Sequence, residues 1–199
     1  MSQTLVVYAH PPTKGHCPEI MDNVLTYLHK HKIDHIFLDL YKMKYDPVLH
    51  AKEHYTAGAK HRTVSKVNKK IQKQILDSDK LIFIYPVWWG SMPAIMKGFI
   101  DKVFVSHFAF KYVPAPIIGA MPKPLLKGRK ALVFLTTGGP WWAWLFFMQR
   151  RAAKHVRTDC FRFFGVKARV YRYGPARQLD DKIKEKIHKM VYKGMDRFY

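Results

Sequence analysis

The stretch LIFIYPVWWG, residues 81–90, decides the fold of this chain. Its first five residues are apolar or aromatic without a break, which is typical of a strand buried on both faces of a parallel sheet. A proline, two adjacent tryptophans and a glycine follow at once, so the strand ends in a loop. In an open α/β sheet, ligands bind outside the carboxyl ends of the strands. The stretch therefore predicts an α/β domain with a binding loop that begins at residue 86.

Apolar runs of the same kind recur along the chain, and helical patterns separate them. Strands are expected at residues 5–8, 36–38, 81–85, 131–135 and 166–171. Helices are expected at residues 19–31, 63–76, 93–105, 145–157 and 179–197. This alternation predicts right-handed crossovers and helices on both faces of the sheet. We predict one doubly wound α/β domain over residues 1–199, with a five-stranded parallel sheet.

The segment 108–130 interrupts the alternation. It contains Pro114, Pro116, Pro122 and Pro124, and it is longer than an ordinary connection between a helix and a strand. We expect a proline-rich loop there, with a functional role or a place in a subunit contact.

The charge is extreme for a chain of 199 residues. Lys and Arg number 35 against 14 Asp and Glu, which gives a formal net charge of +21. Hydrophobic residues make up 48%, and this excludes a disordered basic tail. Three kinds of partner fit the charge: nucleic acid, an anionic membrane surface, and small anionic ligands such as nucleotides.

Cysteine usage and the N-terminal residues indicate a compartment. Cys17 and Cys160 have neither the spacing of a disulfide framework nor that of a zinc site, and we expect no metal. The N-terminal residues lack the cationic region of a signal peptide. The longest apolar run, residues 141–148, is far shorter than the roughly 20 residues that span a bilayer. We expect a cytoplasmic protein that is soluble or at most weakly attached to a membrane surface.

Two of the loops that follow predicted strands carry backbone and polar groups suited to a ligand. In the first, Thr13, Lys14 and Gly15 precede a helix start, and a helix N-terminus stabilises a phosphate. Its spacing matches neither the dinucleotide fingerprint nor the phosphate loop, so an ordinary turn is the alternative. Another loop, residues 136–139, combines two threonine hydroxyls with paired glycines that let a ligand approach the backbone. A simple turn is again the alternative.

The loop between these two holds the adjacent Trp88 and Trp89. A tryptophan pair between proline and glycine is costly to expose to water, so it would cover a flat ligand or else pack into the core.

Several motifs occur in one order: Ala9-His10 and then residues 86–90, 93–98, 108–112 and 136–139. Together they resemble the flavodoxin-like NAD(P)H:quinone oxidoreductases, the family of DT-diaphorase, from about residue 5 to residue 174. The resemblance implies a flavodoxin-like sheet with strand order 2-1-3-4-5 and a bound flavin. It also implies a homodimer, in which aromatic residues of one subunit close over the flavin of the other.

The resemblance assigns roles to particular residues. The phosphate end of the flavin would be surrounded by His10, Gly15, His16 and Cys17. The isoalloxazine would lie along Pro86, Val87, Trp88, Trp89 and Gly90. Its polar edge would bond Thr136, Thr137, Gly138 and Gly139. The substrate pocket would include Phe110, Tyr112 and Trp141.

The chemistry implied is ping-pong transfer: NAD(P)H gives a hydride to the flavin and leaves, and a quinone or related acceptor then takes two electrons. The cofactor would be FMN or FAD, with FMN preferred because the chain lacks a long C-terminal extension to hold an adenine half. The tyrosine and histidine of the DT-diaphorase proton relay align with Trp144 and Arg150. These two are the candidate catalytic residues, and Arg150 would stabilise negative charge on the reduced flavin.

The aromatic segment 141–147 leaves three roles open: a dimer seam, a wall of the substrate pocket, or a membrane-interface anchor beside Arg150 and Arg151. Other functions also remain open for the whole chain. They are an ancillary flavoprotein subunit of a membrane transporter, a one-electron carrier, and a nucleic-acid-binding protein. Carriers of that kind are typically acidic, and the basic residues here are spread over several helices instead of one stripe. We therefore interpret the charge as a field that concentrates anionic NAD(P)H and expect no nucleic acid partner.

Overall fold

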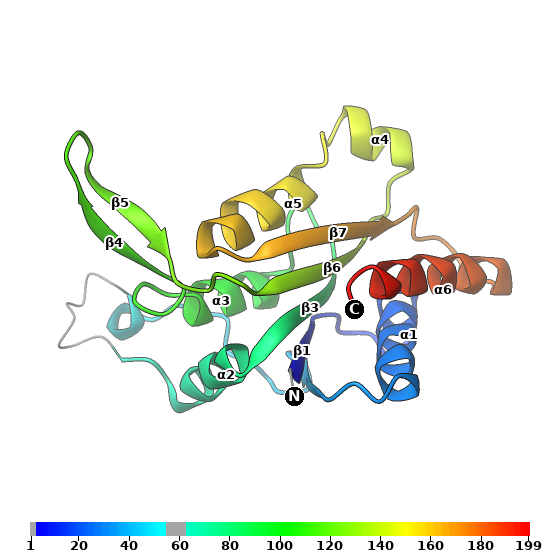
Figure 1. Ribbon diagram of the computed structural model, residues 1–199. Coiled ribbons are helices and arrows are strands. Elements are labelled where there is room, and N and C mark those ends of the chain that lie inside the picture. The colour runs from blue at the N-terminus through cyan, green and yellow to red at the C-terminus, as the bar shows by residue number, and fades with distance from the viewer. Residues whose placement is uncertain (1–2, 55–62) are drawn as a thin grey trace.

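A computed structural model describes residues 3–54 and 63–199 (Figure 1). Residues 1, 2 and 55–62 of the predicted domain lie outside the described residues. A five-stranded parallel sheet runs through the molecule in the order β2-β1-β3-β6-β7. The strands are β1 (Gln3–Tyr8), β2 (His35–Asp39), β3 (Ser78–Pro86), β6 (Lys130–Thr136) and β7 (Lys167–Tyr173). The predicted order 2-1-3-4-5 is confirmed, because the extra strands β4 and β5 form a separate hairpin.

Helices cover both faces of the sheet and explain the unbroken apolar run of β3. On one face, α1 (His16–Lys30) and α6 (Asp181–Asp196) lie side by side (Figure 1). On the other face lie α2 (Lys66–Leu76), α3 (Ala94–Val103), α5 (Arg151–Lys154) and the π-helical η3 (His155–Arg162). Leu81, Phe83 and Tyr85 enter the core under α2 and α3, whereas Ile82 and Ile84 enter the core under α1 and α6. Residues 81–86 of β3 are thus buried whichever face they point to.

The expectation of a loop over residues 108–130 is wrong. The chain forms an antiparallel hairpin of β4 (Phe110–Ala115) and β5 (Gly119–Pro124), which projects from the body of the molecule (Figure 1). Proline is tolerated because both strands of a two-stranded ribbon have a free edge, where no N–H is required. Gly119, with a φ of 76°, supplies the left-handed turn at the tip.

The single helix expected at residues 145–157 is also wrong. A short α4 (Trp141–Phe146) ends, and Gln149 and Arg150 adopt left-handed φ angles of 48° and 54° before α5 begins. A left-handed φ angle is uncommon for residues other than glycine, and no proline or glycine in the sequence predicts this break between the helices. The other expected helices exist, but their ends are shifted. The helix α1 begins at His16 and α2 begins at Lys66. Ser65 caps α2, because its Oγ accepts from the N–H of Asn68. A short helical turn, η1 (Ala51–Glu53), precedes the undescribed segment.

Lys102 connects α3 to the segment after β2. Its Nζ is buried and donates to Asp46 Oδ2 at 2.9 Å and to the carbonyl of Val48 at 2.7 Å, and it lies 3.1 Å from Glu53 Oε2. The helix approaches this loop so closely that a Cβ on Gly98 would lie 2.5 Å from Pro47 Cα. The hydrogen bond from Lys102, together with those from Val48 and His50, lowers the pKa of Asp46 to about 2.

This arrangement predicts a pH dependence of stability. The pKa of Asp46 is lower in the folded chain than in the unfolded chain, so its carboxylate stabilises the fold above about pH 4. That contribution is lost as the pH falls toward about 2. We expect Lys102→Met to lower the free energy of unfolding at neutral pH and to flatten its change between these pH values. Urea denaturation at a series of pH values measures both, and an unchanged acid slope in Lys102→Met would contradict the assignment.

Candidate functional site

A cleft of about 630 Å³ lies beyond the carboxyl ends of β1, β3 and β6. The three loops that follow these strands meet in it, as the sequence predicts. Its size falls within the range of small-molecule binding sites. The cleft is lined by His10, Pro12, Lys14, Gly15, His16, Cys17, Pro86, Val87, Trp88, Trp89, Thr136, Thr137, Gly138 and Ala176.

The loop after β1 presents a helix N-terminus to the cleft. Gly15 precedes α1 with a φ of 126°, a conformation that only glycine adopts without strain. No side chain in the described part of the chain caps α1, so N–H groups of its first turn remain available to an anion. Lys14 is exposed beside them.

His16 is the first residue of α1 and is only 8% exposed. Its ring stacks on Tyr173 with centroids 5.5 Å apart, and its Nε2 is buried with no hydrogen-bond partner among the described residues. Burial lowers the pKa of His16, so the ring is neutral at neutral pH. A ligand in the cleft is the natural partner for this nitrogen, because an unpaired buried polar atom costs free energy.

The loop after β3 makes a tight turn at the cleft wall. The backbone N–H of Trp88 donates to the Ser91 carbonyl at 2.9 Å, and that of Ser91 donates back at 3.0 Å. Trp89 and Gly90 occupy the two left-handed positions between them, with φ angles of 50° and 79°. The side chain of Trp89 is fully exposed. A bulky residue held in a strained turn with its ring in solvent indicates a surface kept for a ligand.

Thr136, at the end of β6, joins the three loops. Its carbonyl accepts from the N–H of Val87 at 2.8 Å, and its Oγ1 lies 3.1 Å from Cys17 Sγ. Burial raises the pKa of the Cys17 thiol to about 12, although the hydrogen bond with Thr136 acts in the opposite direction. A helix N-terminus usually lowers the pKa of a thiol, so desolvation outweighs that effect here.

The next residue is Thr137, and its N–H, its carbonyl and its hydroxyl all form hydrogen bonds. Its N–H donates to the Tyr173 carbonyl at 3.0 Å, and its carbonyl accepts from the N–H of Ala176 at 2.8 Å. Its Oγ1 accepts from Arg172 Nε at 2.8 Å. The third loop is therefore fixed by the end of β7 and by the segment that follows it.

Arg172 and Ala176 carry no signal in the sequence that would place them at the site, because no local pattern marks them. Pro12 also lines the cleft without a predicted role. Lys14 lies in the phosphate-compatible loop, which is a signal that places it in the site.

The remaining predicted residues do not line the cleft. Gly90 and Gly139 adjoin its wall, and Trp144 is buried with the Arg172 guanidinium 5.6 Å from its ring centroid. Arg150 is exposed in the left-handed break between α4 and α5. The proposed pocket aromatics lie on the hairpin and on α4: Phe110 packs on Phe163 at 4.9 Å, whereas Tyr112 and Trp141 are exposed. Their predicted roles at the site stay predictions.

Metal ligands and membrane spans also bear on possible partners. In residues 3–54 and 63–199, no group of three or more His, Cys, Asp or Glu side chains is placed to hold a metal ion. No helix within these ranges is long and apolar enough to cross a membrane.

Comparison with known proteins places this site in a family. A family model described as a flavodoxin-like fold matches residues 2–191. An FMN-dependent NADH:quinone oxidoreductase of Coprothermobacter proteolyticus is 32% identical over 172 residues, which are 83% of this chain and 82% of the relative. The chain belongs to the flavodoxin-like NAD(P)H:quinone oxidoreductase family.

Two further family relatives cover most of the chain. An uncharacterized NAD(P)H oxidoreductase of Haemophilus influenzae is 25% identical over 184 residues, or 91% of this chain and 88% of the relative. The crystal structure of Smu.1420 from Streptococcus mutans is 29% identical, with a TM-score of 0.79, and the match covers 98% of this chain and 99% of that one. The family resemblance of the motifs is thereby confirmed.

The geometry predicts that both cysteines are unreactive. Each is buried, and burial raises the pKa of Cys17 to about 12 and that of Cys160 to about 11. At about pH 8 the thiolate fraction is therefore minute. We expect Ellman's reagent to label neither cysteine in the native protein within minutes and both in denaturant. Rapid labelling of a variant that retains only Cys17 would contradict the packing of Cys17 against Thr136.

Proposed function

We propose that the protein is an FMN-dependent oxidoreductase that uses NAD(P)H to reduce a quinone or a related two-electron acceptor. The observation that carries the proposal is the convergence of the three loops on one cleft, whose helix N-terminus, tryptophan pair and hydroxyl-rich loop suit the phosphate, the ring face and the polar ring edge of FMN. The function of the relative from Coprothermobacter proteolyticus supports the same cofactor and electron donor.

The residues of the cleft suit both ends of FMN. The first turn of α1 with Lys14 and the unpartnered His16 would hold the phosphate. The turn at Trp88 and Trp89 would cover one face of the isoalloxazine. Thr137 and Gly138 would donate to its polar edge.

Bound FMN supplies the redox chemistry, because flavins accept a hydride from NAD(P)H and pass two electrons to quinones. The protein binds, orients and shields the reactants at the open side of the cleft. NAD(P)H and the acceptor would occupy this side in turn, which gives ping-pong kinetics.

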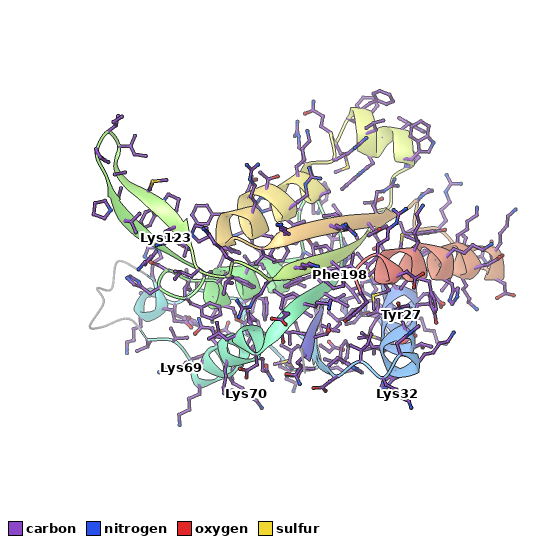
Figure 2. The ribbon with its side chains drawn as sticks, in the orientation of Figure 1. Tyr27, Lys32, Lys69, Lys70, Lys123 and Phe198 are labelled. Atoms are coloured by element: carbon purple, nitrogen blue, oxygen red, sulfur yellow. The ribbon has the colours of Figure 1, made fainter. Side chains whose placement is uncertain are left out.

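The positive charge would assist the encounter with NAD(P)H. Lys32 after α1, Lys69 and Lys70 on α2, and Lys123 on β5 lie on separate parts of the surface (Figure 2). Because the charge is spread over the whole molecule, it acts as a general attractive field for anionic substrates and not as a single docking stripe.

A second copy of the chain would cover two exposed apolar elements. The hairpin exposes Tyr112, Ile117 and Ile118, and α4 exposes Trp141, Trp142 and Phe146. Both elements lie along the same upper side of the molecule, beside α5 (Figure 1). Patches of this kind mark protein or membrane contacts, and we propose a homodimer.

The adjacent glycines of the third loop give a matched test of FMN binding. A Cβ on Gly138 meets nothing within 4 Å, so alanine there places a methyl group in the cleft without disturbing the fold. A Cβ on Gly139 makes an ordinary contact, 3.9 Å from Ala143. We expect Gly138→Ala to raise the Kd of FMN by about tenfold, or roughly 1.4 kcal/mol, and Gly139→Ala to raise it less, because its methyl group would contact Ala143.

Fluorescence titration of the apoprotein with FMN measures these constants, and thermal denaturation checks the fold. Both variants should melt within about 2 °C of the wild-type protein. A colourless wild-type protein that takes up no FMN would refute the proposed function. Equal affinity of the two variants for FMN would contradict a place for Gly138 in the binding site.

The dimer is tested by charges placed on the exposed apolar elements. We expect Ile117→Glu combined with Phe146→Glu to convert the dimer to a monomer, because a carboxylate buried in an interface is strongly unfavourable. Light scattering of the eluting protein gives the mass. Val67→Glu is the control, since Val67 is exposed on α2, away from both elements. A monomeric wild-type protein would contradict the dimer.

A further inference from the structure

We propose that Arg172 is the positioning residue of the flavin site, which holds the loop after β6 so that its donors face the cofactor. The inference rests on the proposed function and adds a residue outside the cleft. Arg172 lies on β7, next to β6 in the sheet, and its register partner is Leu135. Its side chain reaches past the end of β6 and lies behind the loop that lines the cleft.

The guanidinium makes two directed contacts with this loop. Its Nε donates to Thr137 Oγ1 at 2.8 Å, and its Nη2 donates to the Gly139 carbonyl at 3.0 Å. Two donors of one rigid plane thus fix two points of the loop, on either side of Gly138. Lysine could not reproduce this geometry, because its ammonium is a single point.

The contacts decide which groups of the loop remain for a ligand. The Thr137 hydroxyl accepts from Arg172, and its own hydrogen makes only a long contact, 3.5 Å, with the Gly139 carbonyl, which a ligand acceptor can replace. The N–H groups of Gly138 and Gly139 donate to no acceptor among the described residues. With the Gly139 carbonyl turned toward Arg172, the lining part of the loop presents donors. These donors match a heterocyclic ligand that has hydrogen-bond acceptor atoms along one edge.

Packing holds the guanidinium in place. Arg172 is half-buried, and its guanidinium carbon lies 5.6 Å from the ring centroid of Trp144. A Cβ on Gly174 would lie 2.6 Å from Arg172 Nη2, so the chain after β7 closes over the side chain from the other direction. The charge therefore stays beside the loop and favours electron-rich ligand atoms at its far side.

The experiment compares Arg172→Gln with Arg169→Gln in the full-length protein. Arg169 lies on the same strand and also donates to a carbonyl, that of Arg197 at 2.7 Å, but it is exposed and away from the FMN cleft. We expect Arg172→Gln to raise the Kd of FMN by about tenfold or more, since the loop loses charge-assisted hydrogen bonds, and Arg169→Gln to leave it unchanged. Arg172→Lys should restore only part of the affinity.

A second measurement separates positioning from mere stability. We expect Arg172→Gln to shift the midpoint potential of bound FMN to a more negative value, because a nearby cation favours the anionic reduced form. Arg169→Gln should not shift it. Thermal denaturation is recorded for both variants, so that a loss of affinity from unfolding is recognised.

A double-mutant cycle with Thr137→Val completes the design and serves even where Arg172→Gln folds poorly. We expect Thr137→Val with Arg172→Lys to weaken FMN binding less than the sum of the single changes, because both act on one contact. Wild-type affinity and potential in a folded Arg172→Gln protein, or full additivity in the cycle, would overturn the inference. Failure of the wild-type protein to bind FMN would instead refute the proposed function.

Discussion

The architecture depends on the burial of the sheet from both sides. Alternate residues of β3 enter two separate cores, so the backbone between them has no access to water and must pair with the neighbouring strands. Because all five strands of this sheet run parallel, this pairing stops for β1, β3 and β6 at the same end of the sheet. The chain leaves that end in three loops whose polar groups are no longer used by the sheet. The cleft is a direct consequence of how the core is buried.

Few contacts connect these loops, and they gather at the end of β6. Thr136 contacts the first turn of α1 through Cys17 and the second loop through Val87, while Thr137 contacts the end of β7 and the chain after it. The position of β6 between β3 and β7 places its last residues within reach of the loop after β3 and the chain after β7. Donors fixed in this way before a ligand arrives need no rearrangement when it binds, and such preorganisation is the main electrostatic contribution that a protein makes to a reaction.

What the sequence can predict follows from the range of the interactions involved. Buried strands show as unbroken apolar runs, so the strands of the sheet and the three loops of the cleft are predictable from local patterns. The hairpin is not, because its prolines suit a ribbon with free edges, and the break at Gln149 and Arg150 is not, because no proline or glycine marks it. Arg172 escapes prediction for another reason. Its contact with Thr137 joins residues 35 positions apart and exists only because β7 lies beside β6.

Trp144 and Arg150 align with the tyrosine and histidine of the DT-diaphorase proton relay. The contacts of Arg172 suggest a different role for Trp144. An indole donates one hydrogen bond and accepts none through its nitrogen, so Trp144 cannot pass on a proton as a tyrosine can. Arg150 is exposed in a left-handed break and does not line the cleft. The cation that does contact the binding loop is Arg172, and Trp144 is the aromatic residue beside it. Tryptophan at position 144 therefore fits a site in which Arg172 holds the loop after β6. A tyrosine at this position would instead fit a proton relay.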